Sequence, residues 1–343
     1  MTMAFIIAEA GVNHNGSEAR ALDLVEAAAK SGADAIKFQT FSADKLVRRG
    51  AKTAEYQQAA TGENDQYALL KSLELSDDAH RLLFDACNRA GIEFMSTPFD
   101  EEAADFLISI GMRRIKIPSG EITNIPFLRH LARSGLPLIM STGMADLAEV
   151  QTAAAAIAAE RGVADPAELG SDLTILHCTS NYPAGFETAN LRAMATIAQA
   201  TRLPVGYSDH TLGLAVSTAA VALGATVIEK HFTLDRDLPG PDHKASLTVA
   251  ELTDLVAQIR AVELALGDGE KRATESEIAV RALVRRSVAT VTALPAGHVI
   301  QAKDLILLRP ADGIPPAELE RVLGRTTARA IEGGTTIGWS DLA

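Results

Sequence analysis

The sequence has little cysteine, few aromatic residues and no long apolar run. Its two cysteines, Cys87 and Cys178, have no CxxC or other spacing typical of metal ligands, which favours a reduced, cytoplasmic protein. No segment approaches the roughly 20 apolar residues of a membrane span. The apolar run near the N-terminus is short and follows no basic residues, so it does not resemble a signal peptide. We therefore expect no membrane association.

Positive charge is also scarce. The chain has 32 Lys and Arg against 44 Asp and Glu, a formal net charge of −12 at pH 7, and no basic stripe. Because proteins that bind nucleic acid normally carry such a stripe, we expect no nucleic-acid partner. An anionic substrate would need a local cluster of Lys, Arg and backbone N–H groups.

Apolar residues, by contrast, make up 47% of the 343 positions, and the first 267 residues repeat one pattern. A short apolar run ends in polar residues, and a helix-like segment follows it. Runs with almost continuous hydrophobicity are typical of strands buried on both faces of a parallel sheet. The eight runs are residues 5–11, 34–40, 93–99, 114–120, 137–143, 173–180, 204–210 and 226–233.

Helix ends are visible between these runs. One predicted helix begins after a capping Ser76 and stops at Gly91; another begins with the capping box of Thr248 and Glu251. Strands that alternate with helices predict an α/β protein with a parallel sheet, and eight such units predict a (β/α)8 TIM barrel over residues 1–267. A doubly wound open sheet is the alternative, but it normally places its ligand at one switch point.

The pattern changes after the barrel. Residues 268–283 are mostly charged or small and predict a linker, and residues 284–343 predict a small β-rich domain. Within this domain, residues 293–305 and 330–342 share Ala, Gly, Ile, Asp and Leu in register, which indicates two equivalent turn-and-strand units. A domain of about 60 residues is marginal alone and would gain from docking on the barrel or on a partner chain.

Polar side chains end every predicted strand, a pattern typical of a barrel mouth. They are Glu9; Lys37 and Gln39; Ser96 and Thr97; Lys116 and Ser119; Ser141 and Thr142; Thr179 and Ser180; Ser208 and His210; Lys230 and His231. His210 and His231 end consecutive strands, which lie about 5 Å apart, so both imidazoles can reach one cation. The alternative is that one caps a strand end and the other bonds a carboxylate; His177 is predicted to be structural.

Two protein ligands leave coordination positions open, which suits a metal such as Mn²⁺ that also takes oxygen ligands and polarises a carbonyl. Lys37 and Lys116 are costly to desolvate without an anion, so they either cradle a phosphate or carboxylate or pair with Glu9 or Glu121. Glu9 is accordingly either a general acid or base, or a lysine partner.

Two loops complete the predicted mouth. Residues 238–246 contain Pro and Gly and form a shaped loop that can turn Asp242 and His243 toward the mouth. The connection between strands 2 and 3 spans about 50 residues, a length typical of lids and binding loops.

Nine motifs, in order, resemble the bacterial sialic acid synthase family over nearly the whole chain, and the C-terminal stretch is similar to that family's antifreeze-like (SAF) domain. The motifs are IIAEAGVNHNG, IKFQT, STPFD, KIPSGEITN, STGMA, LHCTSNYPA, YSDHTLG, EKHFTLD and PGPDHKAS. The resemblance implies that phosphoenolpyruvate condenses with the open-chain aldehyde of an N-acetylmannosamine-type sugar. The products are a nine-carbon 2-keto acid and phosphate, with C–O cleavage.

The resemblance also implies roles for individual residues. His210 and His231 bind a divalent metal, usually Mn²⁺, with Mg²⁺ or Co²⁺ as alternatives, and Glu9 manages protons when water adds at C2. Phosphoenolpyruvate-binding positions are Lys37, Thr97, Lys116, Ser119, Ser141, Ser180 and Ser208. Sugar-side positions are Gln39, Glu121, Tyr182 and Asp242.

By the same resemblance the protein is a homodimer whose SAF domain caps the partner's barrel and whose Arg309 reaches the sugar's N-acyl group. The sequence departs from the family at this loop, where Leu308, Ala311 and Asp312 replace Lys, Gly and Asn. Ser180 also stands where some members have Asn. These departures affect the path of the loop and one phosphoenolpyruvate contact.

Several functions remain open at this point. N-acetylmannosamine as acceptor, which we favour from the sequence, makes an N-acetylneuraminate synthase. A 2,4-diacetamido-2,4,6-trideoxy-mannose makes a legionaminate synthase. A Schiff-base aldolase would use Lys37, Lys116 or Lys230 without a metal. A non-catalytic sugar-phosphate binding protein would bind phosphoenolpyruvate without releasing phosphate.

Overall fold

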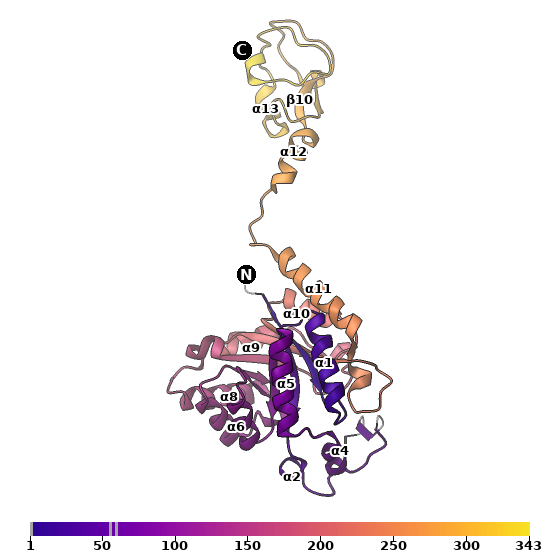
Figure 1. Ribbon diagram of the computed structural model, residues 1–343. Coiled ribbons are helices and arrows are strands. Elements are labelled where there is room, and N and C mark those ends of the chain that lie inside the picture. Colours follow the sequence, from indigo (N-terminus) through magenta and orange to yellow (C-terminus); the bar gives the residue numbers. More distant parts are fainter. Residues whose placement is uncertain (1–2, 55–56, 59–60) are drawn as a thin grey trace. The chain divides into compact units, whose positions relative to one another are not determined.

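The computed structural model describes residues 3–54, 57–58 and 61–343, which fold into two compact units (Figure 1). The boundary between the units falls between Asp268 and Gly269. No helix among the described residues is long and apolar enough to cross a membrane.

Parallel strands form the centre of the first unit. Within its described residues, eight of them are ordered β3-β2-β1-β8-β7-β6-β5-β4, and β3 and β4, at the two ends of this path, contact each other. The strands are β1 Phe5–Gly11, β2 Ala35–Thr40, β3 Glu93–Pro98, β4 Ile115–Ile117, β5 Leu138–Ser141, β6 Leu173–Cys178, β7 Val205–Asp209 and β8 Val227–Thr233. Each lies inside one of the eight predicted runs, so the predicted (β/α)8 barrel is confirmed.

Helices cover the outside of this barrel. They are α1 Glu18–Lys30, α5 Asp77–Ala90, α6 Glu101–Ser109, α7 Ile125–Arg133, α8 Leu147–Glu160, α9 Ala193–Thr201, α10 Ala215–Ala222 and α11 Val249–Leu266. Helix α5 is capped by Ser76 and ends at a left-handed Gly91, and α11 carries the predicted capping box of Thr248 and Glu251. These local signals fix the helix ends because they satisfy backbone groups that the helix itself leaves unpaired.

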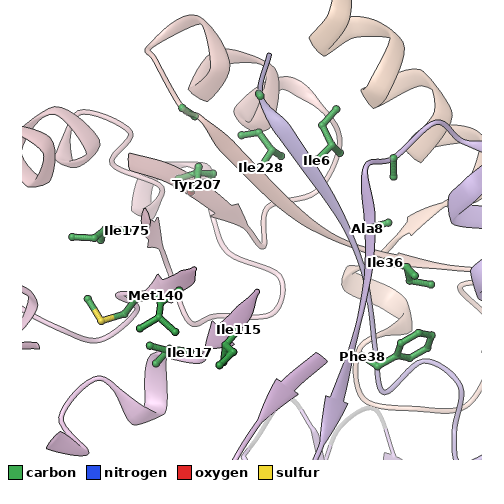
Figure 2. Packing of buried hydrophobic residues seen from close by; sticks show 14 of the residues in the cluster. Ile6, Ala8, Ile36, Phe38, Ile115, Ile117, Met140, Ile175, Tyr207 and Ile228 are labelled. Carbon is green, nitrogen blue, oxygen red and sulfur yellow. The ribbon is translucent and has the colours of Figure 1, made fainter. Parts of the chain in front are cut away.

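The barrel strands are apolar on both faces. Their outward side chains, such as Ile6, Ile36 and Ile228, pack under the helices in the main core (Figure 2). Their inward side chains form a second, smaller cluster that fills the barrel. That cluster consists of Ile7, Ala35, Met95, Ile139, Leu176 and Val227.

The long connection between β2 and β3 carries the short helices α2 Ala43–Leu46 and α4 Gln66–Leu73 before α5. An apolar cluster fastens it to the barrel. Its buried members are Val12, Phe41, Leu69 and Leu73. The parts of this predicted lid at residues 55–56 and 59–60 lie outside the described residues.

The second unit begins with α12 Glu275–Val284, which occupies most of the predicted linker. Strands β10 Ser287–Thr290 and β11 Leu305–Leu308 pair antiparallel, and further bridges join the surrounding turns. The internal repeat is visible in the fold. Leu294 and Ile331, at equivalent positions of the two copies, pair with each other, and Asp304 and Asp341 accept backbone N–H bonds from Gln301 and Gly338 in equivalent turns.

Close packing inside the barrel requires a glycine at position 206. A Cβ atom on Gly206 of β7 would lie 2.4 Å from the Val227 carbonyl oxygen and 2.6 Å from Leu176 Cδ2. We expect Gly206→Ala to lower the free energy of unfolding by about 1–3 kcal/mol, measured by urea denaturation, because the barrel would have to open. Gly120→Ala is the control, since a Cβ there meets nothing within 4 Å. Equal stability of the two variants would contradict this account.

Candidate active site

The functional side chains lie one layer above the apolar cluster inside the barrel. Because inward positions on a strand recur every second residue, each inward apolar residue is followed two positions later by an inward polar one. The pairs are Ile7 and Glu9, Ala35 and Lys37, Met95 and Thr97, Ile139 and Ser141, Leu176 and Cys178, and Val227 and Glu229. One set of strands therefore builds both the barrel floor and a polar layer on it.

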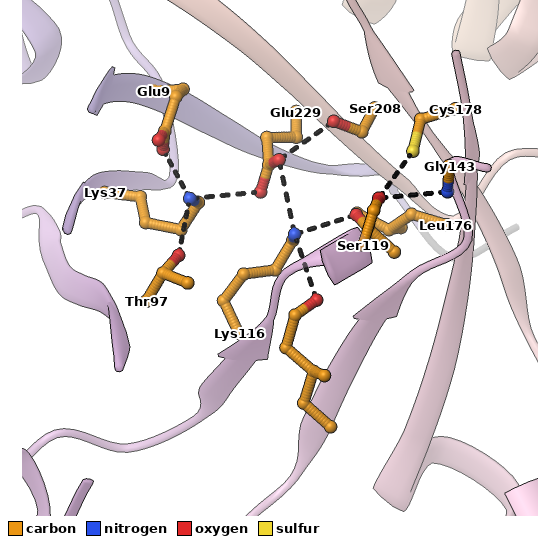
Figure 3. Close-up of polar contacts among 12 residues, drawn as sticks. Glu9, Lys37, Thr97, Lys116, Ser119, Gly143, Leu176, Cys178, Ser208 and Glu229 are labelled. Atoms are coloured by element: carbon orange, nitrogen blue, oxygen red, sulfur yellow. Dashed lines mark hydrogen bonds and ion pairs between the residues drawn. The ribbon is translucent and has the colours of Figure 1, made fainter. Parts of the chain in front are cut away.

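Four buried charges form the centre of this layer (Figure 3). Lys37 Nζ lies 2.7 Å from Glu9 Oε2 and 3.7 Å from Glu229 Oε2. Lys116 Nζ lies 3.5 Å from Glu229 Oε1. Glu229 thus bridges the two lysines, while Glu9 lies beside Lys37 in register across β1 and β2.

Hydroxyl groups form hydrogen bonds with these charged side chains. Lys37 donates to Thr97 Oγ1 at 2.9 Å, and Lys116 donates to Ser141 Oγ at 2.7 Å. Ser208 Oγ donates to Glu229 Oε1 at 2.9 Å. Of the phosphoenolpyruvate-binding residues implied by the resemblance, these contacts bring together Lys37, Thr97, Lys116, Ser141 and Ser208.

The two carboxylates have opposite protonation behaviour. Burial raises the pKa of Glu9 to about 7, against the opposing effect of the Lys37 ammonium group. Burial alone would also raise the pKa of Glu229, but the ammonium groups of Lys116 and Lys37 lower it to about 2. Glu229 is therefore the fixed negative charge, whereas Glu9 can exchange a proton near neutral pH.

The two lysines also differ. Burial alone would lower the pKa of Lys37, but the carboxylates of Glu229 and Glu9 raise it above its ordinary value. Burial lowers the pKa of Lys116, and Glu229 offsets this effect only in part. An anion bound beside Lys116 would therefore stabilise a charge that the protein's own groups compensate only in part.

Two serine hydroxyl groups pack closely around Gly143 next to this cluster. Gly143 N–H donates to Ser119 Oγ at 2.9 Å, and Ser119 Oγ lies 3.3 Å from Cys178 Sγ. A Cβ atom on Gly143 would lie 2.1 Å from Ser180 Oγ and 2.9 Å from Ser119 Oγ. Glycine is required here because any side chain would fill the space between the two hydroxyl groups.

The two mouth histidines lie side by side, with ring centroids 5.5 Å apart. His210 Nδ1 lies 2.6 Å from the Thr179 carbonyl oxygen; a carbonyl only accepts, so Nδ1 carries the proton and Nε2 keeps its lone pair. His231 Nδ1 is buried and has no hydrogen-bond partner among the described residues. Burial lowers the pKa of His210, and lowers that of His231 well below its ordinary value, so both rings are neutral.

These features fit a metal ion held by two imidazoles. Neutral imidazole is the form that binds metals, and a buried ring nitrogen without a partner calls for a ligand. Among the described residues, no group of three or more His, Cys, Asp or Glu gathers as a self-sufficient metal site. Substrate and water would have to supply the other ligands.

A cavity of about 380 Å³ opens beside His231. Its polar lining includes the predicted sugar-side residues Gln39, Glu121, Tyr182 and Asp242. The Tyr182 ring lies over His210 with centroids 4.1 Å apart, and burial raises the pKa of Asp242 to about 6. The rest of the wall is largely apolar, with Val12, Phe41, Leu46, Leu69, Leu70 and Phe99.

The charged cluster and the cavity meet at Gly11. A Cβ atom on Gly11 would lie 3.2 Å from Glu9 Oε1, 3.4 Å from His231 Cε1 and 3.6 Å from Gln39 Nε2. Two reactants, one on the lysines and one in the cavity, would therefore come together beside Glu9.

Some residues predicted at the mouth lie elsewhere. Lys230 faces the helices and pairs with Asp209, and Ser96 faces them to bond Thr40, because each is one position out of the inward register. His243 bonds Thr233 Oγ1 inside the loop, and His177, predicted to be structural, bonds the Ala189 carbonyl. Arg309 is exposed and lies in the second unit, the domain in which it was predicted.

Sequence reasoning missed Glu229 and Cys178 as members of the site. The signal was present, since Val227, Glu229 and His231 alternate along one strand and must share a face. Grouping Lys230 and His231 as one polar strand end concealed this alternation.

Comparison with known proteins gives a consistent result. The model of the NeuB family matches residues 24–271, and that of the SAF domain matches residues 285–343. The chain is 53% identical over 339 residues to the N,N'-diacetyllegionaminic acid synthase of Legionella pneumophila, covering 98% of this chain and 94% of that protein. It is 44% identical over 330 residues to the protein of the same name from Campylobacter jejuni, covering 96% and 97%.

A solved structure is also similar. The N-acetylneuraminic acid (sialic acid) synthetase from Leptospira borgpetersenii, in complex with citrate, matches with a TM-score of 0.70 at 35% identity. The match covers 81% of this chain and 90% of that one.

Loss of the bridging carboxylate should unbalance the charged cluster. We expect Glu229→Gln to lower the free energy of unfolding at pH 7 by about 3–5 kcal/mol, because Lys116 then keeps no carboxylate. The pKa of Glu229 is about 2 in the folded chain and 4.5 ordinarily, so its stabilising effect is present above pH 4.5 and is lost as the pH falls toward 2.

Urea denaturation at several pH values measures this effect. The difference between wild type and variant should shrink as the pH falls below 4.5. Glu121→Gln is the matched control, since the Glu121 carboxylate accepts a hydrogen bond from the exposed Asn124 side chain, and it should change stability by less than about 0.5 kcal/mol. A difference that is constant with pH would contradict the ionic role of Glu229.

Proposed function

The chain belongs to the NeuB family, and on this premise we propose that it is a nonulosonic acid synthase whose acceptor is 2,4-diacetamido-2,4,6-trideoxy-mannose. It condenses phosphoenolpyruvate with the open-chain aldehyde of this sugar. The products are the nine-carbon 2-keto acid N,N'-diacetyllegionaminate and phosphate.

The apolar wall of the cavity supports this acceptor. Compared with N-acetylmannosamine, the diacetamido sugar carries a methyl group instead of a hydroxymethyl group at C6 and an acetamido group instead of a hydroxyl at C4. Both changes add apolar surface or remove a polar group. Phe41, Leu69 and Leu70 offer apolar contacts for such groups.

The similarity to known proteins supports the same acceptor. The sequence alone favoured N-acetylmannosamine, but the two N,N'-diacetyllegionaminic acid synthases share 53% and 44% identity with the chain over almost its full length. The sialic acid synthetase of known structure shares 35%. We therefore prefer the legionaminate alternative to the neuraminate one.

Phosphoenolpyruvate would bind where the chain offers positive charge. Lys37 and Lys116 would hold its anionic groups, together with the hydroxyl groups of Ser119 and Ser180 beside Gly143. In this position the negative charge of the substrate would compensate the ammonium group of Lys116. The same position also brings the substrate next to the point where the cluster meets the cavity.

His210 and His231 would hold a divalent metal, which we propose to be Mn²⁺. When bound, such an ion supplies Lewis acidity that polarises the aldehyde carbonyl. The buried histidines keep neutral rings for this task, and Thr179 fixes the tautomer of His210.

In the reaction a C–C bond forms between C3 of phosphoenolpyruvate and the aldehyde carbon, water adds at C2, and the C2–O bond to phosphate breaks. Glu9 is suited to accept and return the proton of that water, because its pKa of about 7 lies near the working pH. Positioning of the two substrates beside Glu9 would supply much of the remaining rate.

The proposal extends to assembly. The protein would act as a homodimer in which the second unit of one chain covers the barrel mouth of its partner and Arg309 contacts an N-acyl group of the sugar. The resemblance to the sialic acid synthase family and the match to the SAF domain support this arrangement.

Phosphate release is the decisive assay. With metal-stripped enzyme, phosphoenolpyruvate and the diacetamido sugar, we expect release only after Mn²⁺ is added. With N-acetylmannosamine, kcat/KM should be on the order of 100-fold lower, because a shaped apolar pocket discriminates by about this factor. Faster release with N-acetylmannosamine would return the assignment to N-acetylneuraminate, and metal-independent release would refute the role of the histidines.

The apolar wall can be tested separately. Leu70→Gln should lower kcat/KM for the diacetamido sugar roughly 10-fold and leave that for N-acetylmannosamine nearly unchanged, because only the former sugar carries the C4 acetamido methyl and the C6 methyl groups that would contact this wall. Leu82→Gln on α5 is the control, since Leu82 is exposed away from the cavity lining. An equal loss with both sugars would show that Leu70 does not select the acceptor.

A further inference from the structure

A second buried ion pair lies behind the two histidines. Lys230 Nζ lies 2.8 Å from Asp209 Oδ2, and the side chains are 1% and 0% exposed. The two residues are direct partners across β7 and β8, on the faces turned toward the helices. They take no part in the charged cluster inside the barrel, and nothing in the proposed chemistry uses them.

The carboxylate of Asp209 is fully engaged. Its Oδ1 atom accepts bonds from the Thr211 backbone N–H at 2.8 Å and from Thr211 Oγ1 at 2.7 Å. Its Oδ2 atom accepts a bond from Ser217 Oγ of α10 at 2.6 Å, in addition to Lys230. Lys230 also donates to the Thr211 carbonyl. Thr211 is thus held at its N–H, its hydroxyl and its carbonyl.

The residues that make these contacts flank both histidines in the sequence. His210 lies between Asp209 and Thr211, and His231 directly follows Lys230. Beyond Asp209 the β7–β8 ladder has ended, and on its other side the backbone at His210 is held by the Ala184 N–H, which donates to the His210 carbonyl at 2.8 Å. The ion pair and its bonds to Thr211 are what tie that backbone to β8.

We infer that the Asp209–Lys230 pair is a positioning device that sets the separation and direction of His210 and His231 for a shared metal ion. This inference rests on the proposed function of the two histidines. A buried ion pair is often no more stabilising than an apolar pair of the same size, so fold stability alone is a weak reason for burying these charges. Holding two ligands in fixed geometry is a stronger one, because groups that orient metal ligands strongly affect metal affinity.

The double variant Asp209→Asn with Lys230→Met tests this inference in the full-length protein. It removes both charges together, so that no unpaired charge stays buried. Mn²⁺ titration of the metal-stripped protein, followed by the electron paramagnetic resonance of free Mn²⁺, should give a Kd raised about 10- to 100-fold. The visible spectrum of bound Co²⁺ should change as well, because it reports the arrangement of the two nitrogens.

A matched pair at the opposite end of the barrel is the control. Glu93 begins β3 and Arg114 directly precedes β4, at the ends of these strands away from the mouth, and Arg114 Nε lies 2.6 Å from Glu93 Oε1. The double variant Arg114→Met with Glu93→Gln should keep the Mn²⁺ Kd of the wild type. Urea denaturation of both double variants shows whether any change in affinity merely follows stability.

A milder variant covers the case in which the Asp209 and Lys230 double variant does not fold. Ser217→Ala removes one bond to Asp209 and leaves both charges in place, and it should raise the Mn²⁺ Kd in the same direction by a smaller factor. An unchanged Kd in the variants that fold, with normal binding by the wild type, would overturn the positioning role alone. Absence of saturable Mn²⁺ binding by the wild type would overturn the proposed metal site, and this inference with it.

Discussion

Two lysines and two glutamates enclosed in one barrel are the constraint on which the site depends. Charges can be buried only if they compensate each other, and here Glu229 bridges Lys37 and Lys116 while Glu9 adds a weaker partner. The two ammonium groups and the two carboxylates nearly cancel when Glu9 is ionised. An arriving anion adds negative charge beside the lysines, which favours the protonated form of Glu9. Binding of an anionic substrate would thereby prepare the Glu9 carboxyl group for proton exchange.

The period of two along each strand makes this arrangement possible. Inward apolar residues such as Ile7 and Val227 close the barrel, and the next inward residues, Glu9 and Glu229, carry the charge. The outward residues between them pack against helices or, as with Asp209 and Lys230, tie neighbouring strands together. A one-residue shift in any strand would exchange these tasks, so the register of the barrel and the chemistry of the site are fixed together.

Much of this could be predicted from the sequence, for identifiable physical reasons. Apolar runs locate the strands, because strands buried on both faces tolerate few polar residues, and Ser76 or Gly91 mark helix ends through capping. The inward or outward direction of Lys230 was missed because two polar residues in sequence look alike until the alternation is counted. The apolar wall of the cavity was also missed, since Phe41, Leu69 and Leu70 are far apart from Val12 in sequence and meet only in the folded chain.

The elements that carry the site residues suggest why members of one family can use different sugars. Lys37, Lys116, Glu229 and His231 lie on barrel strands, whose positions are held by packing on both faces and cannot easily vary. Most of the apolar wall comes instead from the long β2–β3 connection, which is attached to the barrel through one small cluster. Substitutions in this connection can reshape the wall without disturbing the strands. The steps common to all acceptors would then depend on the barrel, and the choice of acceptor on the connection that covers it.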